Sequence, residues 1–234
     1  MSIKGFPLIL SFHSAPHLWY DHDREVYHMD QAIYDAAKNA FTIESEALIA
    51  ARDAIVQPAF LRAVEALSQA ERIAASGCGH SGIACMHFAH LMCCIDRPAR
   101  FLSPSEAVHG GSGFLMDGDV LLLASRGGKT AELLPMLAIA KQKGAVVISV
   151  TENMQSPLAV DADIVLPMKV TRECDRYDCQ GTTSFVVLSA IFDALQTALI
   201  EHTGFQNEQF ALTHPGGAVG ERLNPGGSGQ RPRT

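Results

Sequence analysis

Basic residues are scarce in this chain. It carries 18 Lys and Arg against 25 Asp and Glu in 234 residues, which gives a formal net charge of −7 at pH 7. The sequence shows no stripe of Lys and Arg. Because nucleic-acid binding depends on clustered basic side chains that neutralise phosphates, the composition argues against nucleic acid as the main partner.

Long hydrophobic runs are missing as well. The longest apolar stretch, Phe185 to Ile200, is interrupted by polar residues and is too short and too polar to cross a bilayer. The apolar run from Phe6 to Phe12 contains Pro7, and no small-residue cleavage site of a secretory leader follows it. We therefore expect no membrane association and a cytoplasmic location.

Cysteines with the spacing of metal or redox motifs are also absent, because none of the six forms a Cys-x-x-Cys pair. A chain of this size that is 47% hydrophobic can build its core without disulfides. We interpret the cysteines as reduced thiols of the cytosol. They are Cys78, Cys85, Cys93, Cys94, Cys174 and Cys179.

Apolar residues recur at helical spacing from Asp30 onward, which predicts a helix to about Ile55 and a second helix that begins at Pro58. Residues 1–28 lack such a period and match no zinc spacing, so we predict a loosely ordered extension there. Residues 224–234 are rich in Gly, Pro and Arg, which predicts a flexible tail. One main domain is therefore expected over residues 29–223.

Strands and helices alternate in the rest of the chain. Short apolar runs predict strands at 72–76, 100–103, 119–125, 145–151 and 164–168, and periodic segments predict helices at 81–94, 131–143 and 182–202. This alternation is typical of an α/β domain with a five-stranded parallel sheet covered on both faces. Ligands bind such folds at the carboxyl ends of the strands, so the residues just after each strand are the candidates for a site.

The loop after the first predicted strand, residues 77–82, fits the pattern G-x-G-x-x-G. A nicotinamide enzyme would also place an acidic residue after the second strand, where this chain has Leu102 and Ser103, so a dinucleotide site is not favoured. Glycines followed by a helix N-terminus still suit an anion, with Gly79 and Ser81 as contacts.

Two further turns are rich in hydroxyl groups. Residues 125–130 lead into a helix, and their final Gly-Lys-Thr resembles the end of a nucleotide P-loop, but the first glycine of that motif would fall inside a strand. Residues 181–184 open the long helix in the same manner. Either turn could be an ordinary helix cap, but together at one sheet edge they suggest a phosphate subsite. Its candidate residues are Ser125, Gly128, Thr130, Thr182, Thr183 and Ser184.

Groups suited to proton transfer stand beside these turns. Glu132 follows the third predicted strand, Glu173 follows the fifth, and His214 comes near the end of the chain. A carboxylate or an imidazole can move a proton between adjacent carbons when its pKa is tuned toward neutrality. We expect these side chains to gather at one edge of the sheet.

From residue 72 to residue 220 the sequence resembles the sugar isomerase (SIS) family, and within it the arabinose-5-phosphate isomerases of the KpsF/GutQ type. The most specific segment is 210–220, Phe-Ala-Leu-Thr-His-Pro-Gly-Gly-Ala-Val-Gly, and residues 106–110 and 182–184 also fit. The resemblance implies a single flavodoxin-like three-layer α/β/α sandwich that binds a sugar phosphate. It further implies a homodimer or homotetramer with sites at subunit interfaces, and catalysis by His80, Glu132, Glu173 and His214.

Some positions depart from the family pattern. His80 stands where the family usually has Lys, and residues 126–130 read Arg-Gly-Gly-Lys-Thr instead of Asn-Ser-Gly-Glu-Ser. The turn after Glu173 lacks the usual proline, and the sequence contains no CBS pair. These departures concern the identity of the sugar more than the fold.

The sequence thus predicts an aldose–ketose isomerase for a pentose 5-phosphate, most simply arabinose 5-phosphate, that works through an enediol without a redox cofactor. Either Glu132 or Glu173 would be the base, and no metal is required, although His80, His109 and His214 could trap zinc. Alternatives are an isomerase for a different sugar phosphate and a phosphosugar-binding protein without activity. A DNA-binding regulator is disfavoured, because the segment before the domain is short and not basic.

Overall fold

A computed structural model of the chain describes residues 18–223. The predicted tail and the first 17 residues of the predicted extension therefore lie outside the described residues. Contacts along the chain divide it into two compact units, one up to Thr42 and one from Ile43 onward.

The first helix is longer than the sequence pattern predicts. Helix α1 runs from Leu18 to Asp53 and so includes residues 18–28, which we expected to be loosely ordered. No Gly or Pro occurs between His17 and Gln57, so nothing in the backbone chemistry stops the helix. The compact unit that holds the sheet also begins later than residue 29, at Ile43.

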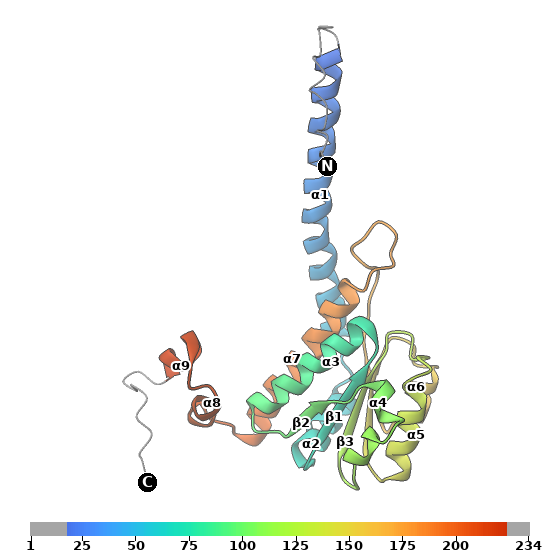
Figure 1. Cartoon of the computed structure of the whole chain (residues 1–234), viewed down its shortest axis with the longest axis vertical. Helices are drawn as coiled ribbons and strands as arrows, with labels where there is room; N and C mark the ends of the chain where they lie inside the picture. The colour runs from blue at the N-terminus through green and yellow to red at the C-terminus, as the bar shows by residue number, and fades with distance from the viewer. Residues whose placement is uncertain (1–17, 224–234) are drawn as a thin grey trace, which may run out of the picture. The chain divides into compact units, whose positions relative to one another are not determined.

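The remaining elements follow the predicted alternation of strands and helices (Figure 1). The strands are β1 (Ile73–Gly77), β2 (Ala99–Phe101), β3 (Val120–Ala124), β4 (Val146–Thr151) and β5 (Ile164–Pro167). The helices after α1 are α2 (Gln57–Gln69), α3 (Gly79–Cys94), α4 (Pro104–Ala107), α5 (Leu134–Gln142), α6 (Pro157–Asp161), α7 (Thr183–Thr203), α8 (Asn207–Thr213) and α9 (Gly217–Leu223), with a 3₁₀ turn η1 (Gly111–Phe114).

Within the described part of the chain the five strands form one sheet, in the order β2-β1-β3-β4-β5, with every neighbouring pair parallel. The predicted five-stranded parallel sheet is therefore confirmed. Gly77 at the end of β1 pairs with Ala124 at the end of β3, so the loops that follow these strands start at the same level. Strand order reverses between β1 and β3, which is where ligands bind in folds of this type.

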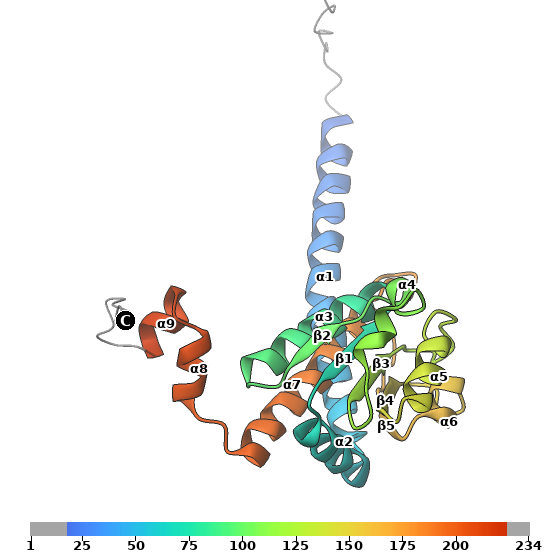
Figure 2. The ribbon, with the colours of Figure 1, turned by 60° about the horizontal axis from the view of Figure 1, so that its bottom comes forward.

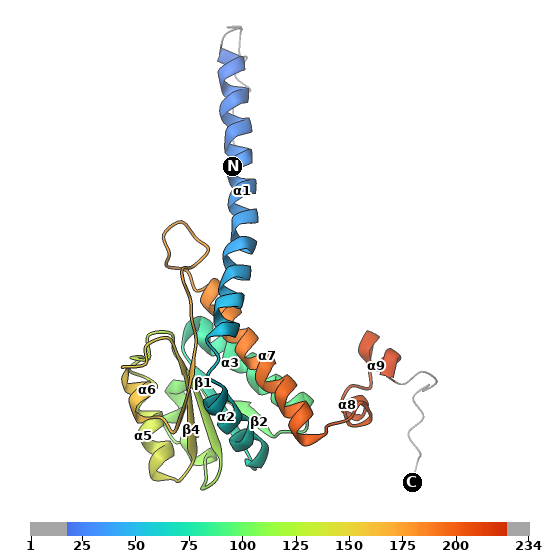
Figure 3. The ribbon, with the colours of Figure 1, turned by 180° about the vertical axis from the view of Figure 1, so that it is seen from behind.

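Helices cover both faces of the sheet, as expected for parallel strands. Figures 2 and 3 show α2, α3 and α7 over one face, and α5 and α6 over the other. Strand β3 contributes to both cores, because Leu122 packs with the first group of helices and Leu121 and Leu123 pack with the second. All five residues of β3 are buried, which explains its unbroken apolar run.

Helix α7 is the most apolar helix of this unit. Contrary to our expectation from the sequence, it is long and apolar enough to cross a membrane by length and composition alone. In the fold one face of it is instead buried in the core, so its hydrophobicity is accounted for by packing. The buried apolar side chains are Val187, Leu188, Ile191, Phe192, Leu195 and Leu199.

Candidate active site

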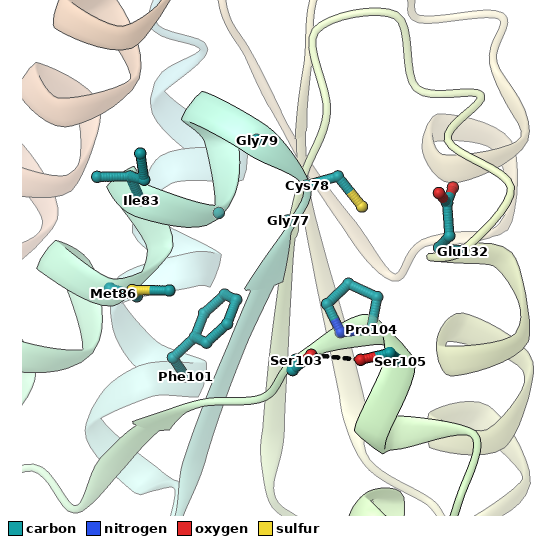
Figure 4. Close-up of a pocket in the computed structure, with 11 residues that line it drawn as sticks. Gly77, Cys78, Gly79, Ile83, Met86, Phe101, Ser103, Pro104, Ser105 and Glu132 are labelled. Atoms are coloured by element: carbon teal, nitrogen blue, oxygen red, sulfur yellow. Dashed lines mark hydrogen bonds between the residues drawn. The ribbon is translucent and has the colours of Figure 1, made fainter. Parts of the chain in front are cut away.

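The carboxyl edge of the sheet carries a cavity of about 350 Å³ beside the point where strand order reverses. Small-molecule sites commonly fall in the range of about 300–1,000 Å³. The lining comes from the β1 loop and the first turns of α3, from the segment after β2, and from the turn before α5 (Figure 4). These residues are Gly77, Cys78, Gly79, Gly82, Ile83, Met86, Phe101, Ser103, Pro104, Ser105 and Glu132.

The cavity has an apolar side and a polar side. In Figure 4 the Glu132 carboxylate and the Cys78 sulfur face one another across the opening, while Met86 and Phe101 lie together on the other side. Burial, and then the negative charge of Glu132, raise the pKa of the Cys78 thiol. Cys78 is therefore a neutral thiol near pH 7, and the Glu132 carboxylate lines the same space.

The glycine loop brings helix α3 directly onto the end of β1. A side chain at Gly82 would lie 2.6 Å from the Gly77 carbonyl oxygen, and one at Gly77 would lie 2.8 Å from the Ser81 carbonyl carbon. Gly79 begins α3 and lines the cavity, and Ser81 is half-buried in the first turn. Both predicted anion contacts after β1 therefore stand at a helix N-terminus, and Gly79 lines the cavity.

The loop after β3 is folded by its own hydroxyl groups. The buried Ser125 Oγ accepts a hydrogen bond from the Gly128 amide at 3.1 Å and lies 2.8 Å from Thr130 Oγ1. Gly128 adopts a positive φ of 65° and lies against Thr151, the last residue of β4, and Ser156, the N-cap of α6. Ser125 thus shapes the turn.

Glu173 lies in a different setting from Glu132. Its carboxylate is only 3% exposed. One oxygen accepts a bond of 2.7 Å from Arg126 Nη1, and the other accepts from the Ser184 amide at 3.0 Å and from Thr182 Oγ1 at 3.4 Å. The anion at the start of α7 is therefore the protein's own carboxylate, as the positive end of a helix dipole favours.

This arrangement bears on the predicted phosphate turn at 182–184. The hydroxyl of Thr182 also accepts from the Cys174 amide, and Thr183 is buried. The Glu173 carboxylate therefore caps the first turn of α7, and a phosphate could bind there only by displacing it. Of the three predicted anion turns, the loop after β1 lines the cavity, whereas Ser125 and Gly128 of the loop after β3 are buried.

His80 links the loop after β1 to the start of α7. It follows Gly79 on the cavity rim, and its ring makes an edge-on contact with Phe185 of α7 at 6.5 Å between centroids. The ring lies so close to Gly181 that a Cβ there would be 2.9 Å from Nδ1. His80 is exposed, so a ligand at this edge can reach it.

His214 does not join the other candidates within one chain, contrary to our expectation. Its Nε2 lies 3.7 Å from Sγ of Cys94, the last residue of α3, whereas His80 is in the first turn of that helix. At 1.5 Å per residue, α3 separates the two by about 20 Å. The cause is α7, which carries the chain away from the carboxyl edge before α8 begins.

The described residues contain no group of three or more His, Cys, Asp or Glu side chains placed to hold a metal ion. The suggested zinc set is therefore not assembled in one chain. His109 is exposed just after α4, and His214 lies near Cys94.

The sequence analysis did not propose two residues of this edge as site residues, namely Arg126 and Glu152. Arg126 Nε donates to Glu152 Oε2 at 2.8 Å while Nη1 bonds Glu173. Burial by itself would lower the pKa of Arg126, but the hydrogen bond and charge of Glu152 and the charge of Glu173 outweigh it and raise that pKa. Their position in the sequence could have identified them, because each directly follows the end of a strand that was predicted from an apolar run.

Two of the relatives found by comparison with known proteins carry the same name. The chain is 38% identical over 165 residues to the arabinose 5-phosphate isomerase KdsD of Pseudomonas aeruginosa, covering 70% of this chain and 51% of that protein. It is 34% identical over 189 residues to the protein of the same name from Yersinia pestis, covering 80% and 57%. The chain thus spans about half the length of these curated relatives.

Solved structures agree with the fold. A Listeria monocytogenes protein superposes with a TM-score of 0.77 at 38% identity, covering 80% of this chain and 98% of that one. An Escherichia coli CFT073 protein, solved in complex with arabinose 5-phosphate, superposes with a TM-score of 0.75 at 29% identity, covering 79% and 98%. The SIS domain model matches residues 66–198, which is more than half of the sequence. The chain therefore belongs to the SIS domain family.

Proposed function

We propose that this protein is an aldose–ketose isomerase that interconverts arabinose 5-phosphate and ribulose 5-phosphate through an enediol. The observation that carries the proposal is the cavity at the carboxyl edge, which combines a glycine loop at the N-terminus of α3 with the Glu132 carboxylate. A helix N-terminus suits the phosphate, and a carboxylate suits the carbon-bound proton. The named relatives and the arabinose 5-phosphate complex of a structural neighbour support the choice of sugar.

The chemistry needs only proton movements. A base removes the proton from C2 of the open-chain aldose, and the same proton or one from water returns to C1. A second group moves a proton between the two oxygens. Exposed His80, which directly follows Gly79 of the cavity lining, is suited to that second task. Exposed Lys129 and half-buried Thr130 in the β3 loop are suited to the phosphate.

The protein is further proposed to act as a homodimer or homotetramer in the cytoplasm. His214 is about one helix length from its own His80, so it could complete a site only in another copy. Apolar side chains remain exposed at the start of the second compact unit, as expected of a subunit contact. These are Leu48, Ile49, Ile55 and Val56. Light scattering should report two or four copies, and a monomer at micromolar concentration would contradict this part.

An isomerase assay across pentose, hexose and heptose phosphates tests the function, with NMR following exchange of the carbon-bound proton in D₂O. We expect turnover to be fastest with arabinose 5-phosphate. Turnover of a different sugar phosphate would keep the reaction and correct the substrate. Saturable binding without exchange would favour a phosphosugar-binding protein without activity, a role that the His80 departure from the family pattern would permit.

A further inference from the structure

The two glutamates of the carboxyl edge are held in opposite ways. Both oxygens of Glu173 accept bonds from donors of the protein, with 3% of the residue exposed. Glu132 is exposed and lines the cavity, with its carboxylate directed into the open space (Figure 4). The structure therefore separates two residues that the sequence pattern could not tell apart.

A general base must place an oxygen within about 3 Å of the proton that it removes. Glu132 can do this for a sugar in the cavity without breaking any hydrogen bond found among the described residues. Glu173 would have to release Arg126 or the first turn of α7 before an oxygen could face a ligand. The geometry favours Glu132 as the proton carrier.

Arg126 makes the position of Glu173 rigid. Its Nε bonds Glu152 Oε2 at 2.8 Å, and Glu152 Oε1 in turn accepts the Val170 amide at 3.2 Å. The backbone amide of Glu152 also donates to the Arg126 carbonyl at 3.0 Å. One guanidinium thus ties together the segments that follow β3, β4 and β5.

Glu173 is connected to His80 through the first turn of α7. Glu173 accepts bonds from Thr182 and Ser184 in the first turn of α7. The same turn presents Gly181 and Phe185 to the His80 ring. Any shift of Glu173 would therefore move the surface against which the imidazole rests.

We propose that Glu132 is the catalytic base and that Glu173, fixed by Arg126, is a positioning residue that holds the first turn of α7 against His80. The inference rests on the proposed isomerase function. In the step assigned to Glu132, its carboxylate takes the C2 proton, the C2–H electron pair becomes the C1–C2 double bond, and O1 gains a proton. Return of the proton to C1, with loss of the O2 proton, yields the ketose, so no oxidant or reductant is needed.

Two matched substitutions separate the roles. Glu132→Gln should lower exchange of the C2 proton by about a hundred-fold or more, because the amide cannot take the proton. Glu173→Gln keeps an oxygen that can accept from Ser184, so exchange should fall by no more than about ten-fold, in kcat, with KM nearly unchanged. A purely structural role for Glu173 would leave kcat unchanged below the melting transition. The assignment is overturned if Glu173→Gln abolishes exchange while Glu132→Gln retains it.

The role of Arg126 is tested by charge rescue. Arg126→Met should lower kcat, and Arg126→Lys should recover part of the loss because an ammonium can still bond Glu173, although not both glutamates at once. Equal losses in the two variants would overturn a charge-based positioning role.

A stability cycle provides a readout that does not depend on activity. Arg126→Met and Glu173→Gln should each lower the melting temperature, and the double variant should lose less than the sum, because no buried charge is left alone. Arg126→Met combined with Glu132→Gln should be additive, which makes it the control. Additive losses in the first pair would overturn the role of Arg126 in fixing Glu173. If the wild type catalyses proton exchange in none of the sugar phosphates, the proposed function is wrong, and so is the role of Glu132. The melting temperatures would still show whether Arg126 and Glu173 interact.

Discussion

Two neighbouring glycines of the β3 loop provide a sharp test of the structure. Gly128 has a backbone φ of 65°, a left-handed conformation that residues other than glycine adopt only with strain. A Cβ at Gly128 would also overlap the Ser156 hydroxyl and lie 2.8 Å from Thr151 Oγ1. Ser156 is not free to move away, because its Oγ accepts the Ala159 amide at 3.3 Å as the N-cap of α6.

The cost of Gly128→Ala can be estimated from these two effects. A left-handed conformation costs an alanine about 1–2 kcal/mol. Forcing a methyl group into a packed site costs about 1–3 kcal/mol more. The free energy of unfolding should therefore fall by about 2–5 kcal/mol, and the melting temperature by about 4–20 °C for a domain of this size.

Gly127→Ala is the matched control. Gly127 is exposed, and a Cβ built on it meets no atom within 4 Å. The melting temperature of Gly127→Ala should lie within about 2 °C of that of the wild type, as for an ordinary surface substitution. Differential scanning calorimetry of the three proteins measures both shifts. Equal stability of Gly128→Ala and Gly127→Ala would refute the conformation and packing assigned to this loop.

Three further outcomes are expected. Hydrogen bonds from the Gln180, Tyr177 and Cys179 amides lower the pKa of Asp175 below its ordinary 3.8, so their stabilisation of the 175–180 turn is fully present above that value and is lost as pH falls through the lowered pKa. The protection of these amides, measured relative to their intrinsic exchange rates at each pH, should fall only in that acidic range, and a loss of protection near pH 6 would contradict the assignment. Burial raises the pKa of Cys85, so a thiol reagent at pH 8 should modify exposed Cys93 and Cys179 and leave Cys85 unlabelled until the protein unfolds, as mass spectrometry can show. His80→Lys should change the pH dependence of kcat/KM without abolishing turnover, since lysine stays charged across the neutral range, and superimposable profiles would exclude His80 from the chemistry.

The sheet was predictable because each strand carries a signal that does not depend on the rest of the chain. The run Val120 to Ala124 is apolar without interruption because it is buried on both faces. The order of the strands was not predicted, because the right-handed crossover rule does not specify which strands pair. The start of α1 was not predictable from amphipathic periodicity. Residues 18–28 are helical without such a pattern, which shows that continuity of the backbone can extend a helix beyond its apolar stripe.

The candidate site was predictable to the level of its loops. Knowing where strands end identifies Gly79, Ser125, Glu132 and Glu173 as neighbours of one edge. Sequence position says nothing about which way a side chain turns, so it could not reveal that Glu173 faces Arg126 and α7. Nor could it place His214, because that depends on the length and direction of the helix that precedes it.

The close contact between β1 and α3 has a consequence for how the glycine loop can vary. Each of Gly77 and Gly82 makes room for the backbone of the other segment, and not for a side chain. No replacement at one position can therefore compensate a change at the other, and in a randomised library both should return as glycine independently, without covariation. The G-x-G-x-x-G spacing records how closely a helix approaches a strand, so a search for dinucleotide enzymes by this pattern will also find proteins that share only that approach.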